Sequence, residues 1–201
     1  MNIDTVEQLR SLYAMPRERA VRKQLCTLDG HCRRFIELSP FVVVASSSVA
    51  RAMDASPRGG APGFVRVPDE RTLLIPDAPG NNRLDTFENI LGTGAIGLFF
   101  MIPGIDETLR VNGAARLSCE ARHIELFPGE KRRPKLVIEV RVAQAYLHCA
   151  KALMRSALWA PESRVSRSCL PSMGQMINRQ TGIEMPAETE EQMRARYAPD
   201  L

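Results

Sequence analysis

The chain has 201 residues, of which 44% are hydrophobic and 25% charged, and this composition excludes an intrinsically disordered protein. It contains no run of 18 uncharged apolar residues and no basic N-terminal segment followed by an apolar one, so we expect neither a transmembrane helix nor a secretory signal. The formal net charge of +4 is mildly basic, which a phosphate-bearing ligand explains as well as nucleic acid does.

The cysteines indicate a cytoplasmic protein without a metal site. Their number, five, is odd and none is spaced as in CxxC, so reduced thiols fit better than disulfides or zinc. His31 and His123 show no ligand spacing with an acidic residue or a cysteine. His148 is adjacent to Cys149, but neighbours in an extended segment point to opposite faces, so we do not expect a catalytic pair.

The N-terminal part is predicted to be helical. Apolar side chains recur every three or four positions within residues 5–26. Pro16 is expected to divide this segment, with a second helix over residues 17–27. Residues 29–31 predict a turn, and residues 32–38 predict a short helix.

The middle of the chain is predicted to form a β-sheet. The six expected strands, each a continuous or alternating apolar run, cover residues 41–48, 64–67, 72–75, 95–102, 109–117 and 135–143. Residues 54–63 are rich in Gly and Pro and predict a loop. Because turns join most of the strands, we expect an antiparallel sheet that closes into a barrel or a sandwich to cover its edges. Residues 84–91 carry one apolar stripe and predict a helix between two strands.

The C-terminal part is again predicted to be helical, over residues 148–159, 172–182 and 187–197, with Gly182 ending the second helix. We therefore expect a mainly β protein with flanking helices, organised as one domain. Its parts are a helical N-terminal extension (1–38), a β core (39–148) and a helical C-terminal region (149–201).

Two loops and one strand carry candidate binding residues. In SPRGGAPGF (56–64) the glycines allow backbone to approach a flat ligand and Arg58 offers a fork of donors, although an irregular loop at a barrel rim explains the same residues. In the strand 109–117, Arg110, Asn112 and Arg116 share one face, which is either the outer surface or one wall of a cleft.

The second loop lies in PDAPGNNRLDTFENIL (76–91) and is the strongest candidate. Asn82 is expected to cap the helix that begins near Arg83, with Asp85 completing the capping geometry. Free N–H groups at a helix start, together with Asn81 and Arg83, suit a phosphate group. The alternative is that both asparagines only cap and turn the chain while Arg83 lies in solvent.

The order of these motifs resembles one known family. An apolar strand is followed by SPRGGAPGFVRV, TLLIPDAPGNNRLDTFENIL, GAIGLFFMIPG, ETLRVNGAARL and AYLHCAKALMRSALW. The series is similar to pyridoxamine 5′-phosphate oxidase-like flavoproteins, over residues 30–160. The resemblance implies a six-stranded, FMN-binding split β-barrel and a homodimer with FMN between the protomers.

The same resemblance implies site residues. The FMN phosphate would contact Asn81, Asn82 and Arg83. The isoalloxazine ring would pack against residues 56–60, which include Ser56, Arg58 and Gly59, and against the strand 61–66 with Arg66. Thr108 and Arg110 would lie near the cofactor. His148, Lys151, Arg155 and Trp159 would reach the flavin of the other protomer or, alternatively, belong to a helix packed at the dimer interface.

Departures from the family pattern bear on activity. The chain ends in RARYAPDL and lacks the R-L-x-P-like ending and the R-x-V-L-L-K strand of authentic pyridoxamine phosphate oxidases, so vitamin B6 oxidation is not expected. We predict an FMN-dependent oxidoreductase acting on an unidentified small molecule, with no catalytic residue assigned. The alternatives are a non-catalytic flavin-binding protein and a relative using deazaflavin or haem. Nucleic-acid binding is not expected, because aromatic content is 5% and no ring lies between Arg110 and Arg116.

Overall fold

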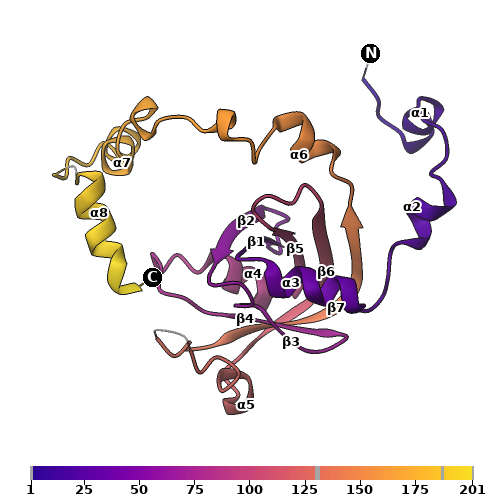
Figure 1. The fold of residues 1–201 in the computed structure, drawn as a ribbon, viewed down its shortest axis with the longest axis horizontal. Helices are drawn as coiled ribbons and strands as arrows, with labels where there is room; N and C mark the ends of the chain where they lie inside the picture. Colours follow the sequence, from indigo (N-terminus) through magenta and orange to yellow (C-terminus); the bar gives the residue numbers. More distant parts are fainter. Residues whose placement is uncertain (1, 130–131, 187, 201) are drawn as a thin grey trace.

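The computed structural model describes residues 2–129, 132–186 and 188–200. A seven-stranded antiparallel sheet has the order β2-β1-β5-β6-β7-β4-β3 (Figure 1). The strands are β1 (Phe41–Ser47), β2 (Met53–Gly59), β3 (Arg66–Asp69), β4 (Thr72–Pro76), β5 (Ala95–Met101), β6 (Thr108–Ser118) and β7 (Val137–His148). The predicted mainly β class, with antiparallel pairing and flanking helices, is confirmed.

The sheet has one strand more than the six predicted, and the additional strand is β2. The sequence predicts a loop over residues 54–63, but β2 pairs with β1 along its whole length, with Pro57 opposite Val43. β2 lies at the edge of the sheet, where the missing N–H of a proline costs no ladder hydrogen bond. The loop prediction is wrong because Pro and Gly, which favour turns, are also tolerated on an edge strand.

β6 and β7 form a long ladder that a bulge interrupts. Asn112 lies opposite Gln144 and Gly113 lies opposite Val142, so one residue of β7 is extra at this point. A β-carbon on Gly113 would overlap the carbonyl oxygen of Arg141. The ladder therefore requires glycine at this position unless the backbone shifts.

The N-terminal helices are α1 (Val6–Ser11), α2 (Glu18–Arg22) and α3 (Gly30–Leu38). Pro16 separates the first two, as predicted, although both are shorter than expected. The side chain of Asp29 accepts a hydrogen bond of 2.8 Å from the backbone N–H of Cys32 and caps α3. The turn predicted over residues 29–31 is therefore wrong, since it is the first turn of this helix.

Two helices lie between strands, α4 (Asp85–Thr93) and α5 (Ala121–Ile124). α4 confirms the helix predicted over residues 84–91, and it buries Thr86 and Ile90, which are one turn apart. α5 was not predicted, because a helix of four residues is too short to show periodicity.

The C-terminal helices are α6 (Lys151–Ser156), α7 (Met173–Thr181) and α8 (Glu190–Tyr197), with 3₁₀ turns η1 (Pro161–Ser163), η2 (Arg167–Cys169) and η3 (Ala198–Asp200). The helix predicted from residue 148 begins later, because His148 is the last residue of β7. Gly182 has a φ of 69° and ends α7 as predicted. No residue of α6, α7 or α8 is buried, and Figure 1 shows α7 and α8 apart from the sheet.

The main core lies on one face of the sheet, and a smaller buried cluster joins Leu74 and Val137 to Ile124 of α5 and Phe127. Alternate residues of the strands point into the main core, among them Val42, Val44, Leu98, Phe100, Leu109, Val111, Ile138 and Val140, and α3 adds Cys32, Phe35 and Ile36. The opposite face of β5, β6 and β7 carries partly buried polar and aromatic side chains, which form part of the candidate site below.

The N-terminal segment is attached to the sheet at Leu25. The backbones of Leu25 and Ala145 exchange two hydrogen bonds, both of 2.9 Å. This bridge places α2 close to the end of β7. Across the described residues, the helices are all too short or too polar to traverse a lipid bilayer.

Gly113→Ala tests the steric requirement in the β6–β7 ladder. We expect it to lower the free energy of unfolding by about 1–3 kcal/mol, because the added methyl group overpacks against backbone. Urea denaturation measures this change. Gly129→Ala is the control, since nothing lies within 4 Å of a β-carbon there. Equal stability of the two variants would contradict the steric argument.

Candidate functional site

A polar network joins β2 to α4. Asp54, Ser56 and Arg58 alternate along β2 and are each partly buried. The buried hydroxyl of Thr86 in α4 donates to a carboxylate oxygen of Asp54 at 2.7 Å, and the Ser56 hydroxyl donates to the same carboxylate at 3.1 Å. The Asp54 carboxylate therefore fastens the first turn of α4 to the edge strand.

Arg58 is the cation of this network. Its Nη2 donates to Thr86 Oγ1 at 3.4 Å, and its Nη1 donates to the carbonyl of Pro57 at 2.8 Å. Burial lowers the pKa of the guanidinium, while the charges of Asp54 and Asp77 oppose that shift. Burial also raises the pKa of the Asp77 carboxyl. Arg58 is thus held in place at the sheet edge.

The loop before α4 differs from the prediction. α4 begins at Asp85, its N-cap is Leu84, and no side chain caps it, so the predicted capping by Asn82 is wrong. Asn82 and Leu84 have left-handed backbones, with φ of 60° and 61°. Asn81 Oδ1 instead accepts a hydrogen bond of 3.1 Å from the N–H of Arg83. Asn81 thus shapes the loop, and the N-terminus of α4 is left without a side-chain cap.

Arg83 lies beside this open helix end. Its side chain is 73% exposed, and its Nε donates to Asp85 Oδ2 at 2.8 Å. An exposed ion pair of this kind contributes little to stability. An uncapped helix start and an exposed guanidinium are both suited to an anion.

A second group lies on the face of the sheet opposite the core. The Arg110 guanidinium lies 4.5 Å from the centre of the Tyr146 ring, and the His148 ring lies 4.9 Å from the same ring. The centre of the Phe99 ring in β5 lies 5.9 Å from the centre of the His148 ring. Among the described residues, Arg110 Nε and His148 Nε2 are buried and have no hydrogen-bond partner. Such nitrogens are costly unless a ligand or a second chain satisfies them.

The electrostatics of this face favour neutral histidine. Burial lowers the pKa of His148, and the positive charges of Arg110 and Lys23 lower it further. Lys23 lies 5.3 Å from the centre of the Tyr146 ring. The face therefore presents fixed cations around a neutral imidazole at pH 7.

The remaining predicted residues are placed as follows. Thr108 is buried and lies opposite His148 in the β6–β7 ladder. Gly59 ends β2 next to Arg58. The Arg66 guanidinium donates to the carbonyls of Leu126 and Gly63, at 3.1 and 2.9 Å. These bonds hold its side chain near the end of α5.

The C-terminal candidates lie beyond the sheet. Lys151 and Arg155 are exposed on α6. Trp159 Nε1 donates to the carbonyl of Ile105 at 2.9 Å, which holds the chain after α6 against the β5–β6 loop. The structure thus places Ser56, Arg58 and Gly59 on β2, which Thr86 joins to the first turn of α4, and it places Thr108 with Arg110 on β6. Within the part of the chain that is described, no hydrogen bond joins Arg66, Lys151 or Arg155 to these residues.

Sequence reasoning missed Asp54, Thr86, Lys23 and Tyr146. Asp54, Ser56 and Arg58 are spaced by two, which is a strand signal that the glycines and Pro57 obscured. Lys23 and Tyr146 carry no local signal, because only the Leu25 bridge brings them together. Within the described residues, no cluster of three His, Cys, Asp or Glu side chains is arranged to hold a metal ion.

A family model described as pyridoxamine 5′-phosphate oxidase matches residues 28–149. The chain belongs to this family. The match includes the whole sheet and the polar residues of β2, α4, β6 and β7, but not Lys23, and it confirms the resemblance seen in the motif order. A search of curated proteins found no match.

Solved structures show similarity to this chain, and one of them has a TM-score above 0.5. A variant of HupZ from Group A Streptococcus is 18% identical, with a TM-score of 0.51 over 60% of this chain and 99% of that chain. A putative pyridoxamine 5′-phosphate oxidase from Lactobacillus delbrueckii is 16% identical, with a TM-score of 0.48 over 62% of this chain and 98% of that chain. An FAD-binding protein from Mycobacterium smegmatis is 13% identical, with a TM-score of 0.43 over 62% and 97%. The family match over residues 28–149, which contains every strand, identifies the sheet as the split β-barrel of the family.

Thr86→Val tests the network between β2 and α4. It removes a buried hydroxyl and leaves the Asp54 carboxylate short of a donor, so we expect the free energy of unfolding to fall by about 1–3 kcal/mol. Chemical denaturation measures the loss. Thr181→Val in α7 is the control, because its hydroxyl bonds only to exposed backbone groups of Ile177 and Ile183, and it should cost less than Thr86→Val. A loss no larger than that of the control would mean that the network does not fasten α4.

Proposed function

We propose that the protein is a homodimeric flavoprotein that binds FMN and uses it to oxidise or reduce a small molecule. The observation that carries this proposal is the uncapped N-terminus of α4 beside the exposed guanidinium of Arg83. A plain connector would need only a cap, whereas this loop leaves α4 without a side-chain cap and places Arg83, which is ion-paired with Asp85, beside the helix start. Membership of the pyridoxamine 5′-phosphate oxidase family makes a flavin phosphate the natural anion.

The phosphate end of the cofactor is assigned to residues 81–83. Arg83 supplies the charge, and Asn81 and Asn82 give the loop the shape that leaves the helix end open. Arg58, held by Thr86, adds a second guanidinium at the adjoining strand edge. These groups fit a phosphate, because Arg donors and helix N–H groups form the strong, charge-assisted class of hydrogen bond.

The ring end of the cofactor is assigned to Arg110 and Thr108 on β6. The buried Nε of Arg110 lacks a partner among the described residues, and a flavin carbonyl is an acceptor that would satisfy it. A bound flavin supplies the electron transfer. The protein would contribute orientation, donors that tune the ring, and a cleft that selects the substrate.

A second copy of the chain is proposed to complete the site. The face that carries Arg110 and His148 is only partly covered within one chain, and the chain beyond α6 extends away from the sheet (Figure 1). A homodimer would contact this face, and it would give α6 with Lys151 and Arg155, and the following segment with Trp159, a surface to pack against. The described cysteines are all free thiols, which suits the reducing cytoplasm that we propose as the location.

Arg83→Ala tests the proposed phosphate contact. We expect FMN to bind about tenfold or more weakly, because a charge-assisted contact is lost while the fold and the dimer stay intact. Quenching of FMN fluorescence measures the dissociation constant, and light scattering measures the mass relative to the 22.4 kDa chain.

The control is Arg122→Ala. Arg122 is also exposed and ion-paired, with its Nε 2.6 Å from Glu120 Oε2, but it lies on α5. Parallel titrations with FAD and a deazaflavin test the choice of cofactor. Wild-type protein that binds none of the three flavins, or an Arg83→Ala variant that binds FMN as tightly as Arg122→Ala, would contradict the proposal.

A further inference from the structure

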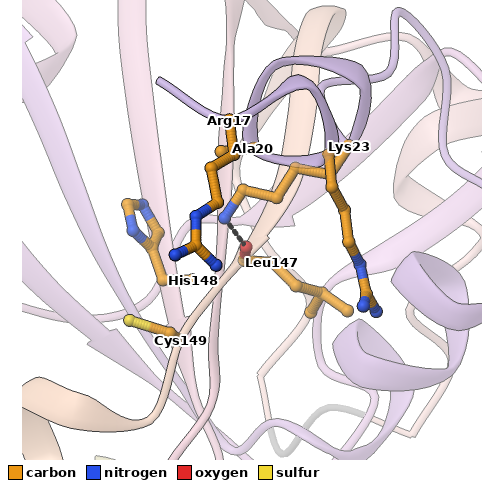
Figure 2. A pocket seen from close by; sticks show the side chains of 7 residues that line it. Arg17, Ala20, Lys23, Leu147, His148 and Cys149 are labelled. Carbon is orange, nitrogen blue, oxygen red and sulfur yellow. Dashed lines mark hydrogen bonds between the residues drawn. The ribbon is translucent and has the colours of Figure 1, made fainter. Parts of the chain in front are cut away.

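A basic hollow lies between α2 and the end of β7. Its volume is about 380 Å³, and its lining residues are Arg17, Arg19, Ala20, Lys23, Leu147, His148 and Cys149. Figure 2 shows the side chains of Arg17 and Lys23 reaching from the N-terminal segment toward His148 and the Leu147 carbonyl. Neither the family resemblance nor the proposed FMN contacts assign a role to the N-terminal residues.

The charge of this hollow is unbalanced. Three of its lining residues are cations and none is acidic. The nearest acid on the same helix, Glu18, is turned to Arg22, with 2.7 Å between Arg22 Nη2 and Glu18 Oε1. The cations of the hollow are therefore not neutralised by the helix that carries them.

The wall formed by β7 adds a neutral polar group. Burial and the neighbouring charges of Arg110 and Lys23 lower the pKa of His148, so its imidazole is uncharged at pH 7. Its buried Nε2 has no partner among the described residues. A ligand bearing negative charge would gain from the cations and would also favour protonation of this imidazole.

The N-terminal segment holds a defined position on this strand. The Leu25–Ala145 bridge anchors it, and Lys23 Nζ donates to the carbonyl of Leu147 at 2.8 Å. Arg17 and Lys23 are thus placed beside β7 by backbone pairing rather than by chance contact of two surface side chains.

We propose that this hollow binds a small molecule through a carboxylate or phosphate group. The hollow is shallow and open to solvent, so a small ligand can reach it, and its donors are of the kind that bind anions. His148 connects it to the face with Tyr146 and Arg110. The anion site does not require a flavin, but its assignment to the substrate rests on the proposed function. The substrate class is then a small molecule that carries an anionic group.

The histidine resonances provide the test, because the chain has only three histidines. Inorganic phosphate and succinate are titrated in turn into the flavin-free full-length protein, with sodium chloride keeping the ionic strength constant. We expect a saturable shift of the His148 ring signals in ¹H–¹³C spectra and a rise in the pKa of His148. The stronger of the two probes identifies phosphate or carboxylate as the preferred group.

The variant Arg17→Ala/Lys23→Ala should weaken binding of the stronger probe about tenfold or more. Arg17→Ala alone leaves the Lys23–Leu147 contact intact and should give a smaller loss, which guards against misfolding of the double variant. Arg22→Ala is the matched control, since Arg22 lies on the same helix outside the hollow. No shift of His148 with either probe, or equal binding by the double variant and the control, would overturn the proposal.

An FMN titration on the same samples separates the two hypotheses. Loss of anion binding in the double variant with unchanged FMN affinity supports an independent site. Wild-type protein that binds FMN but neither anion overturns the proposed anion site and leaves the proposed function unaffected. Wild-type protein that binds an anion at His148 but no flavin overturns the proposed function and the substrate assignment, while the anion site stands.

Discussion

The bulge in the β6–β7 ladder is the constraint on which the rest of the molecule depends. Before it, Ile138, Val140 and Val142 of β7 point into the core. Side chains alternate with a period of two, so an unbroken strand would also point Gln144, Tyr146 and His148 inward. The extra residue at the bulge reverses the alternation and buries Ala145 instead. One inserted residue thus turns the polar end of β7 outward.

Both sites proposed for this face follow from that reversal. It aligns Tyr146 with Arg110 across the ladder and brings His148 to the outer end of the strand. The backbone of Ala145 is then paired with Leu25, which draws α2 and its cations to the same place. Gly113 makes the arrangement possible, because a side chain there would collide with the Arg141 carbonyl.

The sequence predicted the elements with strong periodicity and missed those that depend on pairing between distant segments. The apolar runs of β1 and β5 were read correctly, because their side chains alone show which face is buried. The helix α4 was also predicted, but its apolar stripe was not a guide to burial, since Leu84 and Leu91 are exposed and Thr86 is buried instead. β2 was missed, because its small and polar residues become a strand only by pairing with β1. β7 was predicted to stop at residue 143 for a related reason, since the alternation fails at the bulge and local patterning no longer signals a strand.

The sequence likewise predicted some residues of the candidate site and missed others. Arg83 and Arg110 were identified from local context, and the structure leaves Arg83 exposed and one nitrogen of Arg110 unpaired. The residues that interact with the candidate side chains lie elsewhere in the chain. Thr86 contacts Arg58, Tyr146 lies against Arg110, and the charge of Lys23 acts on His148. Arg66 is the opposite case. Its sequence position suggested the site, but its guanidinium donates to the carbonyls of Leu126 and Gly63.

The distribution of charge suggests how the two proposed anion sites differ. At α4 the cation Arg83 already has Asp85 as a partner, so a phosphate there must compete with a carboxylate and gains mainly from the open helix end. In the hollow beside His148 no acid competes among the lining residues, and the imidazole can take up a proton when an anion arrives. The first arrangement depends on geometry and suits a cofactor that stays bound. The second depends on net charge and is more sensitive to salt, which suits a ligand that exchanges at each turnover.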